Sequence, residues 1–131
     1  MSLDVSPELI ADAEHGEIDD DRFLAAVERS LPYAWSVMSR VAGELKMSLS
    51  AGRAFADDAT PPTEEERGQL LRALASTSIR AAMERRFGVR FAFQNCHRVA
   101  AFPASGMERE YRDFCSSRAQ VLNQTPELRH C

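Results

Sequence analysis

The chain has 131 residues, of which 44% are hydrophobic and 27% are charged, and its formal net charge is −4. These values are typical of one soluble globular domain, and they exclude a collagen, a coiled-coil rod and a wholly disordered chain. No apolar run approaches the roughly 20 residues of a membrane-spanning helix, and residues 1–12 carry acids where a signal peptide carries bases. We therefore expect a single domain over residues 1–131, located in the cytoplasm.

The charges are divided unevenly along the chain. Residues 1–66 hold fifteen acids and five bases, whereas residues 67–131 hold five acids and eleven bases. This asymmetry predicts that the two halves contact each other, within the molecule or across a dimer. The alternative is an anionic partner bound by the basic half.

The first half of the chain predicts three helices. The segment from Ser6 favours a short helix that ends before Gly16, because serine caps helices and proline is tolerated at the first helical position. A second helix is expected from the acidic run at 19–21 to Ser30. A third is expected over 33–49, where apolar residues recur at steps of three and four.

The remaining helices are predicted from loop and capping signals. Residues 50–62 contain Gly, paired Asp and paired Pro, which predict a loop. A capping box at 63–66 should start one long helix that ends at Gly88. A last helix is expected over 105–122, followed by a tail at 123–131.

Between these helices the apolar period changes from 3.6 to 2, which predicts one short antiparallel hairpin near residues 89–102. An even-numbered loop, which pairs Phe93 with Arg98 and Phe91 with Ala100, gathers the apolar side chains on one face. Four or five helices would pack on that face. The predicted fold class is therefore α+β and mostly helical.

The most reactive residue types lie at the predicted hairpin tip. Cys96 is a candidate nucleophile beside His97, and cations such as Arg90 and Arg98 would favour its thiolate. At a tip these residues should be partly exposed, and loops carry many functional residues. If the protein has chemistry, we expect Cys96 and His97 to carry it.

Metal and phosphate sites are disfavoured by spacing. Adjacent strand residues such as Cys96 and His97 point to opposite faces, so they rarely bind one zinc ion with Cys115. The acidic runs at 19–21 and 64–66 stand at helix starts, where the helix dipole explains them. No phosphate-binding glycine loop occurs, and the three cysteines do not suggest a disulfide framework. We expect no metal and no cofactor.

Four residues are candidates for ligand binding. Arg90 and Arg98 are suited to an anion because guanidinium binds carboxylate and phosphate in a bidentate manner. Tyr33 and Trp35 are suited to an interface or a pocket, although such aromatics more often have a core role. Nucleic acid is disfavoured because the acidic half would repel it.

Four blocks resemble a known family: LPYAW (Leu31–Trp35), RGQLLRALAS (Arg67–Ser76), FGVRFAFQNCHRVAAFP (Phe87–Pro103) and LNQTPEL (Asn123–Leu128). The chain is similar to a family of small uncharacterised actinobacterial proteins of the Streptomyces type. The resemblance spans nearly the whole chain and implies a cytoplasmic protein from a GC-rich genome. Fifteen Arg against one Lys agree with such a genome. The resemblance implies no activity or catalytic residue.

The sequence favours a non-enzymatic protein-interaction or regulatory protein that forms a homodimer. A lone hairpin has unpaired edges, which invite another strand. The expected partner is a second copy or another protein, and neither nucleic acid nor a membrane. The alternative is a small enzyme, or an anion- or small-molecule-binding protein, with a site at Cys96, His97 and Arg98.

Overall fold

The computed structural model describes residues 2–52, 54–95 and 97–124. These residues form seven helices and a three-stranded antiparallel sheet with the strand order β1-β3-β2. The predicted α+β class is confirmed, with more helices and one more strand than expected. The elements are α1 (Pro7–His15), α2 (Asp20–Ser30), α3 (Pro32–Ser50), β1 (Ala56–Asp58), α4 (Glu64–Leu74), α5 (Thr77–Phe87), β2 (Val89–Gln94), β3 (Arg98–Pro103), α6 (Glu108–Phe114) and α7 (Ser117–Leu122).

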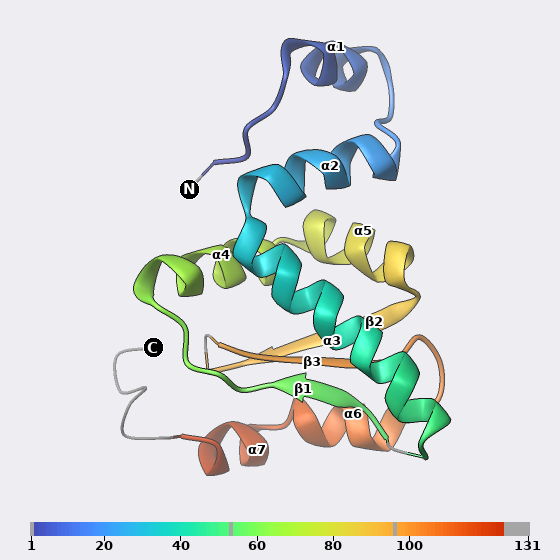
Figure 1. The fold of residues 1–131 in the computed structure, drawn as a ribbon, viewed down its shortest axis with the longest axis vertical. Helices are drawn as coiled ribbons and strands as arrows, with labels where there is room; N and C mark the ends of the chain where they lie inside the picture. The colour runs from blue at the N-terminus through green and yellow to red at the C-terminus, as the bar shows by residue number, and fades with distance from the viewer. Residues whose placement is uncertain (1, 53, 96, 125–131) are drawn as a thin grey trace.

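The sheet lies between two helical layers (Figure 1). Helices α3, α4 and α5 cover one face, while α6 and α7 lie along the other. Helices α2 and α1 extend the first layer away from the sheet. The expectation that the hairpin has helices on one face only is therefore wrong.

The principal core fills the space between the first helical layer and the sheet. Helix α3 crosses the whole core, and its buried side chains recur at steps of three and four, as the sequence predicted. The sheet contributes alternate residues of its two longer strands to this core: Val89, Phe91, Val99 and Ala101.

A second, smaller core lies between the sheet and α6. It contains the buried residues Ala92, Ala100, Phe102 and Phe114, with Phe55 and Tyr111 packed against them. The side chain of Phe102 is fully buried. Both faces of the hairpin are thus covered with apolar side chains.

Capping residues set the helix boundaries. Ser6 accepts a hydrogen bond from the Leu9 amide at the start of α1, and the predicted capping box between Thr63 and Glu66 opens α4. Gly88 ends α5 in the left-handed conformation, with φ of 65°. These predictions are confirmed.

Two predicted helices are each divided in two, and an internal serine caps the second piece in both cases. Ser76 accepts a hydrogen bond from the Ile79 amide, so α4 and α5 replace the long helix. Ser116 accepts one from the Ala119 amide and separates α6 from α7. A serine inside a helical pattern can serve as an N-cap, and here it does.

The predicted hairpin register is wrong by one residue. Phe93 lies opposite Val99 and Phe91 opposite Ala101, so the loop has an odd number of residues. Asn95 opens this loop with φ of 55°, a conformation that asparagine tolerates. Because both sheet faces are buried, collecting all apolar residues on one face did not identify the register.

The segment predicted as a loop over 50–62 contains the third strand. Ala56 pairs with Ala101 and Asp58 with Val99, so β1 covers one side of β3. Consecutive aspartates are poor strand formers, which is why no strand was predicted in this segment. β3 is therefore the central strand, and β2 forms an outer edge.

Candidate functional site: the edge of β2

The hairpin tip is held by structural contacts. His97 is only 6% exposed, and its Nδ1 lies 2.7 Å from the Asn95 carbonyl oxygen, so its expected exposure is wrong. Arg98 donates from Nε and Nη2 to Asp57 Oδ2 at 2.8 and 2.6 Å, and thereby links β3 to β1. Cys96 lies outside the described residues.

Arg90 fastens the connection between β3 and α6 onto β2. Its Nε donates to the Pro103 carbonyl at 3.0 Å and its Nη2 to the Gly106 carbonyl at 2.7 Å. Its Nη1 donates to Glu108, and the guanidinium lies 4.5 Å from the centre of the Tyr111 ring. These contacts give Arg90 a structural role in this conformation.

Tyr33 and Trp35 lie in the first turns of α3. The Trp35 ring packs on Phe87, with 5.8 Å between ring centres, and this is the ordinary core role. Tyr33 is half-buried, and burial raises the pKa of its phenol. The structure therefore does not bring these aromatics together with Arg90 and Arg98 at one site.

The two charged halves of the chain meet within the molecule. Arg85 pairs with Asp20 and Arg86 with Asp21, which ties α5 to the start of α2. Together with the Arg98 contact to Asp57, these pairs confirm the predicted approach of the halves. The α5 pairs are exposed to solvent, so they stabilise the fold little and salt weakens them further.

A buried carboxylate predicts a dependence of stability on pH. Asp58 accepts a hydrogen bond from the Thr60 amide at 2.8 Å and one from Arg40. Burial alone would raise the pKa of Asp58, but the contacts with Thr60 and Arg40 outweigh it and hold this pKa below its usual value. Ionised Asp58 therefore stabilises the fold above the unfolded-state pKa of about 3.9, and this contribution is lost as pH falls through the folded-state pKa.

We expect Asp58→Asn to lower the free energy of unfolding at pH 7 by about 1–3 kcal/mol, and by less at pH 3. Urea unfolding at both pH values measures the difference. Asp113→Asn, at an exposed position on α6, is the control and should change little at either pH. An equal loss for Asp58→Asn at both pH values would contradict the assignment.

The edge of β2 carries outward-facing backbone groups. Antiparallel pairs alternate between hydrogen-bonded and non-hydrogen-bonded positions. Pro103, which has no N–H, lies opposite Val89, and the Phe91 amide donates to Glu84 Oε2 at 2.8 Å instead of to β3. Val89, Phe91 and Phe93 therefore direct their amides and carbonyls away from the sheet.

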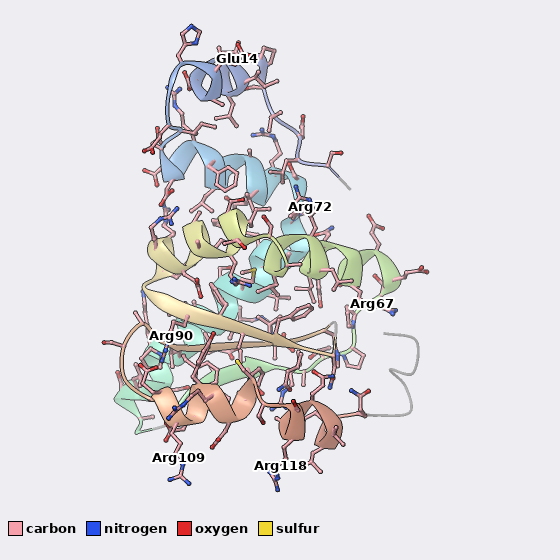
Figure 2. The ribbon with its side chains drawn as sticks, turned by 180° about the vertical axis from the view of Figure 1, so that it is seen from behind. Glu14, Arg67, Arg72, Arg90, Arg109 and Arg118 are labelled. Atoms are coloured by element: carbon pink, nitrogen blue, oxygen red, sulfur yellow. The ribbon has the colours of Figure 1, made fainter. Side chains whose placement is uncertain are left out.

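An open hollow of about 500 Å³ runs beside this edge, and we call it the edge hollow. Figure 2 shows β2 at the front of the sheet, with α4 and α5 above it and α6 below. The hollow has apolar walls with a few charged groups. It is lined by Leu71, Leu74, Ala75, Arg80, Glu84, Arg90, Phe91, Ala92, Phe93, Tyr111 and Cys115.

The edge hollow is not suited to thiol chemistry. Burial raises the pKa of the Cys115 thiol, so the sulfur stays protonated near neutral pH. Burial also raises the pKa of the neighbouring Tyr111 phenol. Near neutral pH, Cys115 and Tyr111 therefore supply neither a thiolate nor a phenolate in the hollow.

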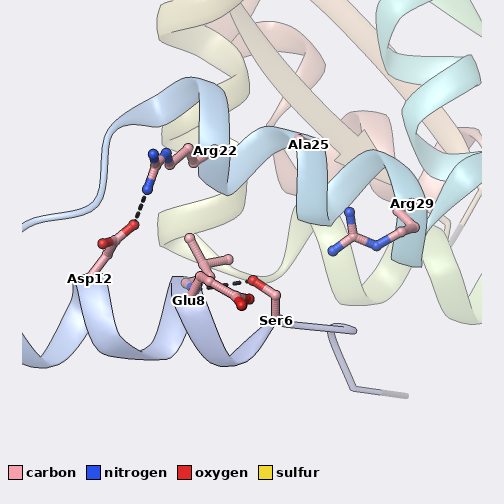
Figure 3. A pocket seen from close by; sticks show the side chains of 7 residues that line it. Ser6, Glu8, Asp12, Arg22, Ala25 and Arg29 are labelled. Carbon is pink, nitrogen blue, oxygen red and sulfur yellow. Dashed lines mark hydrogen bonds and ion pairs between the residues drawn. The ribbon is translucent and has the colours of Figure 1, made fainter.

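A smaller hollow of about 250 Å³ lies between α1 and α2, and its polar side chains hold the two helices together. Figure 3 shows Arg22 reaching Asp12, and Ser6 capping α1. Arg29 donates to the carbonyl oxygen of Asp4. These charged groups fasten α1 to α2.

The described residues contain no group of three or more His, Cys, Asp or Glu side chains that would hold a metal ion. Within the same ranges, no helix combines the length and apolar character needed to cross a bilayer.

Sequence reasoning missed the edge hollow. It predicted one long helix up to Gly88, whereas α4 ends at Leu74 and Leu71 is 44% exposed at the rim of the hollow. It gave Glu84 no role. The signals were present in Ser76, which breaks the helix, and in Pro103, which marks a non-hydrogen-bonded position of the hairpin.

The family described as NucS shadow ORF matches residues 1–131, and the chain belongs to this family. No curated protein and no solved structure matches the chain. The family description names no activity, substrate or cofactor.

Proposed function

We propose that this member of the NucS shadow ORF family is a non-enzymatic protein-interaction protein that forms a homodimer through the edge of β2. The supporting observation is an edge strand of six residues whose outward backbone groups border an open, largely apolar hollow. Exposed edge strands are templates for pairing with another chain.

The two edges of the sheet differ in how well they are protected. β1 has only three residues and carries Asp57 and Asp58, and short charged edges resist pairing. β2 is longer and its sequence, VRFAFQ, is mostly apolar. Pairing with another strand is therefore favoured at β2.

The alternative site at Cys96, His97 and Arg98 has less support. The His97 ring is buried with one nitrogen at the Asn95 carbonyl, and the Arg98 guanidinium is engaged by Asp57. An anion or a substrate would have to displace these contacts.

We also infer an actinobacterial origin and a cytoplasmic location. Fifteen Arg against one Lys favour the first, since such a bias is typical of GC-rich genomes. The acidic, charged composition with three cysteines favours a location in which thiols stay reduced.

Sedimentation velocity at micromolar concentrations tests the proposal. The wild-type chain should sediment as a dimer, and Leu71→Lys, which places a charge at the rim of the edge hollow, should weaken the dimer by about tenfold or more. Leu71 is exposed, so the variant should keep its fold.

Leu49→Lys is the matched control. Leu49 lies at the end of α3, is 47% exposed against 44% for Leu71, and does not line the hollow. It should leave the dimer unchanged. A wild-type chain that stays monomeric, or an equal effect of both substitutions, would refute the proposed interface.

A further inference from the structure

Two charged side chains of α5, Arg80 and Glu84, lie one after the other along the edge of β2. Helix α5 leads through the turn at Gly88 directly into β2, so the two elements run in opposite directions. Glu84 contacts the backbone of Phe91. Arg80 lies one helical turn earlier and also lines the hollow. Because α5 and β2 run in opposite directions, this turn places Arg80 on the Phe93 side of Glu84.

Neither charge has an ion-pair partner among the described residues. Arg80 donates from Nη1 to the carbonyl oxygen of Leu74 at 3.0 Å, and Glu84 accepts the amide of Phe91. Each is therefore available to form a close ion pair with a group brought into the hollow. One chain thus presents one cation and one carboxylate beside a strand edge that carries its own outward groups.

A two-fold axis between two copies would pair both the outward backbone groups of β2 and the charged side chains of Arg80 and Glu84. In an antiparallel pair of β2 strands centred on Ala92, Phe91 of each copy lies opposite Phe93 of the other, and their outward amides and carbonyls exchange hydrogen bonds. The same axis brings Glu84, which lies beside Phe91 of one copy, toward Arg80, which lies on the Phe93 side of the other copy. Ala92 lies at the centre, where the strands approach most closely and a small side chain fits.

We propose that β2 pairs antiparallel with β2 of a second copy about this axis, and that Glu84 of each copy faces Arg80 of the other. This inference rests on the proposed function and specifies the occupant of the edge hollow. In the dimer the Phe91 amide donates to the Phe93 carbonyl of the second copy instead of to Glu84. The Glu84 carboxylate is then free to pair with Arg80 of the second copy. Self-complementarity favours a second copy over an unrelated strand.

Charge reversal tests this arrangement. Arg80→Glu alone places two carboxylates opposite each other at both contacts, and Glu84→Arg alone places two cations there. Each single variant should weaken the dimer at least tenfold in sedimentation equilibrium. The double variant R80E/E84R should restore it, and so should an equimolar mixture of the two single variants, because both recreate opposite charges across the axis.

The milder variants Arg80→Gln and Glu84→Gln guard against loss of folding. Glutamine at position 84 still accepts the Phe91 amide, so E84Q should fold normally while weakening the dimer severalfold. Arg109→Glu is the charge control, since Arg109 projects from α6 away from the β2 edge (Figure 2). It should leave the dimer unchanged, and circular dichroism should verify that every variant folds.

The outcomes separate this inference from the proposed function. If Leu71→Lys weakens the dimer but folded charge-reversal variants do not, the edge hollow is the interface and the two-fold pairing is wrong. If the folded single variants lose the dimer and their mixture does not regain it, the contact between Glu84 and Arg80 is wrong. A monomeric wild-type chain overturns both proposals.

Discussion

Truncation of Phe102 to alanine should lower the free energy of unfolding by about 3–5 kcal/mol. Phe102 is fully buried at the centre of the second core. Its ring centre lies 4.6 Å from that of Phe55, 5.4 Å from Tyr111 and 5.6 Å from Phe114. Because these rings join the sheet to α6, their loss of contact should loosen α6 as well as destabilise the whole fold.

Urea unfolding measures this destabilisation, and hydrogen exchange of the α6 amides measures the loosening. Phe102→Leu is the control, because it keeps an apolar side chain and should cost less than half as much as alanine. An alanine variant within about 1 kcal/mol of wild type would show that this side chain does not hold α6 against the sheet.

The second core explains why the hairpin was predicted in the wrong register. Residues 89–93 alternate between apolar and less apolar side chains. In a strand with one buried face, this alternation would reveal the pairing register. Here Phe91 and Phe102 face opposite layers, and both are buried. The covering layer, α6, follows the hairpin in the chain, and the sequence does not show where it will pack.

The third strand depends on tertiary contacts in the same way. Asp57 and Asp58 oppose strand formation locally, yet each finds an arginine, Arg98 and Arg40 respectively. These arginines come from β3 and α3, which are distant in the chain. Helix starts, by contrast, depend on residues a few positions apart, so the capping signals of α1 and α4 were readable from the sequence.

The candidate site in the structure differs from the predicted one for a related reason. Reactive residue types directed attention to the tip at Cys96 and His97, since residue chemistry is visible in a sequence. Which hairpin edge stays open is a property of strand order, because β1 covers the free side of β3 and leaves only the outer side of β2 unpaired in the hairpin. The sequence predicted an unpaired hairpin edge and therefore an interaction protein, but it did not identify which edge.

Replacing Gln69 with leucine should lower the free energy of unfolding by about 2–4 kcal/mol. Helix α3 begins at Pro32 without a side-chain cap from its own segment. The Gln69 side chain, which comes from α4, accepts the amide of Tyr33 at 2.7 Å and that of Ala34 at 3.2 Å through one oxygen. Leucine would leave both amides without this acceptor at a site where Gln69 is only 8% exposed.

Gln69→Glu separates this capping role from simple packing. Glutamate keeps the acceptor oxygen, and its negative charge is favoured at a helix N-terminus, so it should cost much less than leucine near neutral pH. Urea unfolding of both variants gives the comparison. If leucine proves as stable as glutamate, the cap contributes little and α3 is held by its buried face alone. The expected order, with leucine well below glutamate, would show that α4 fixes the start of the longest helix in the described chain.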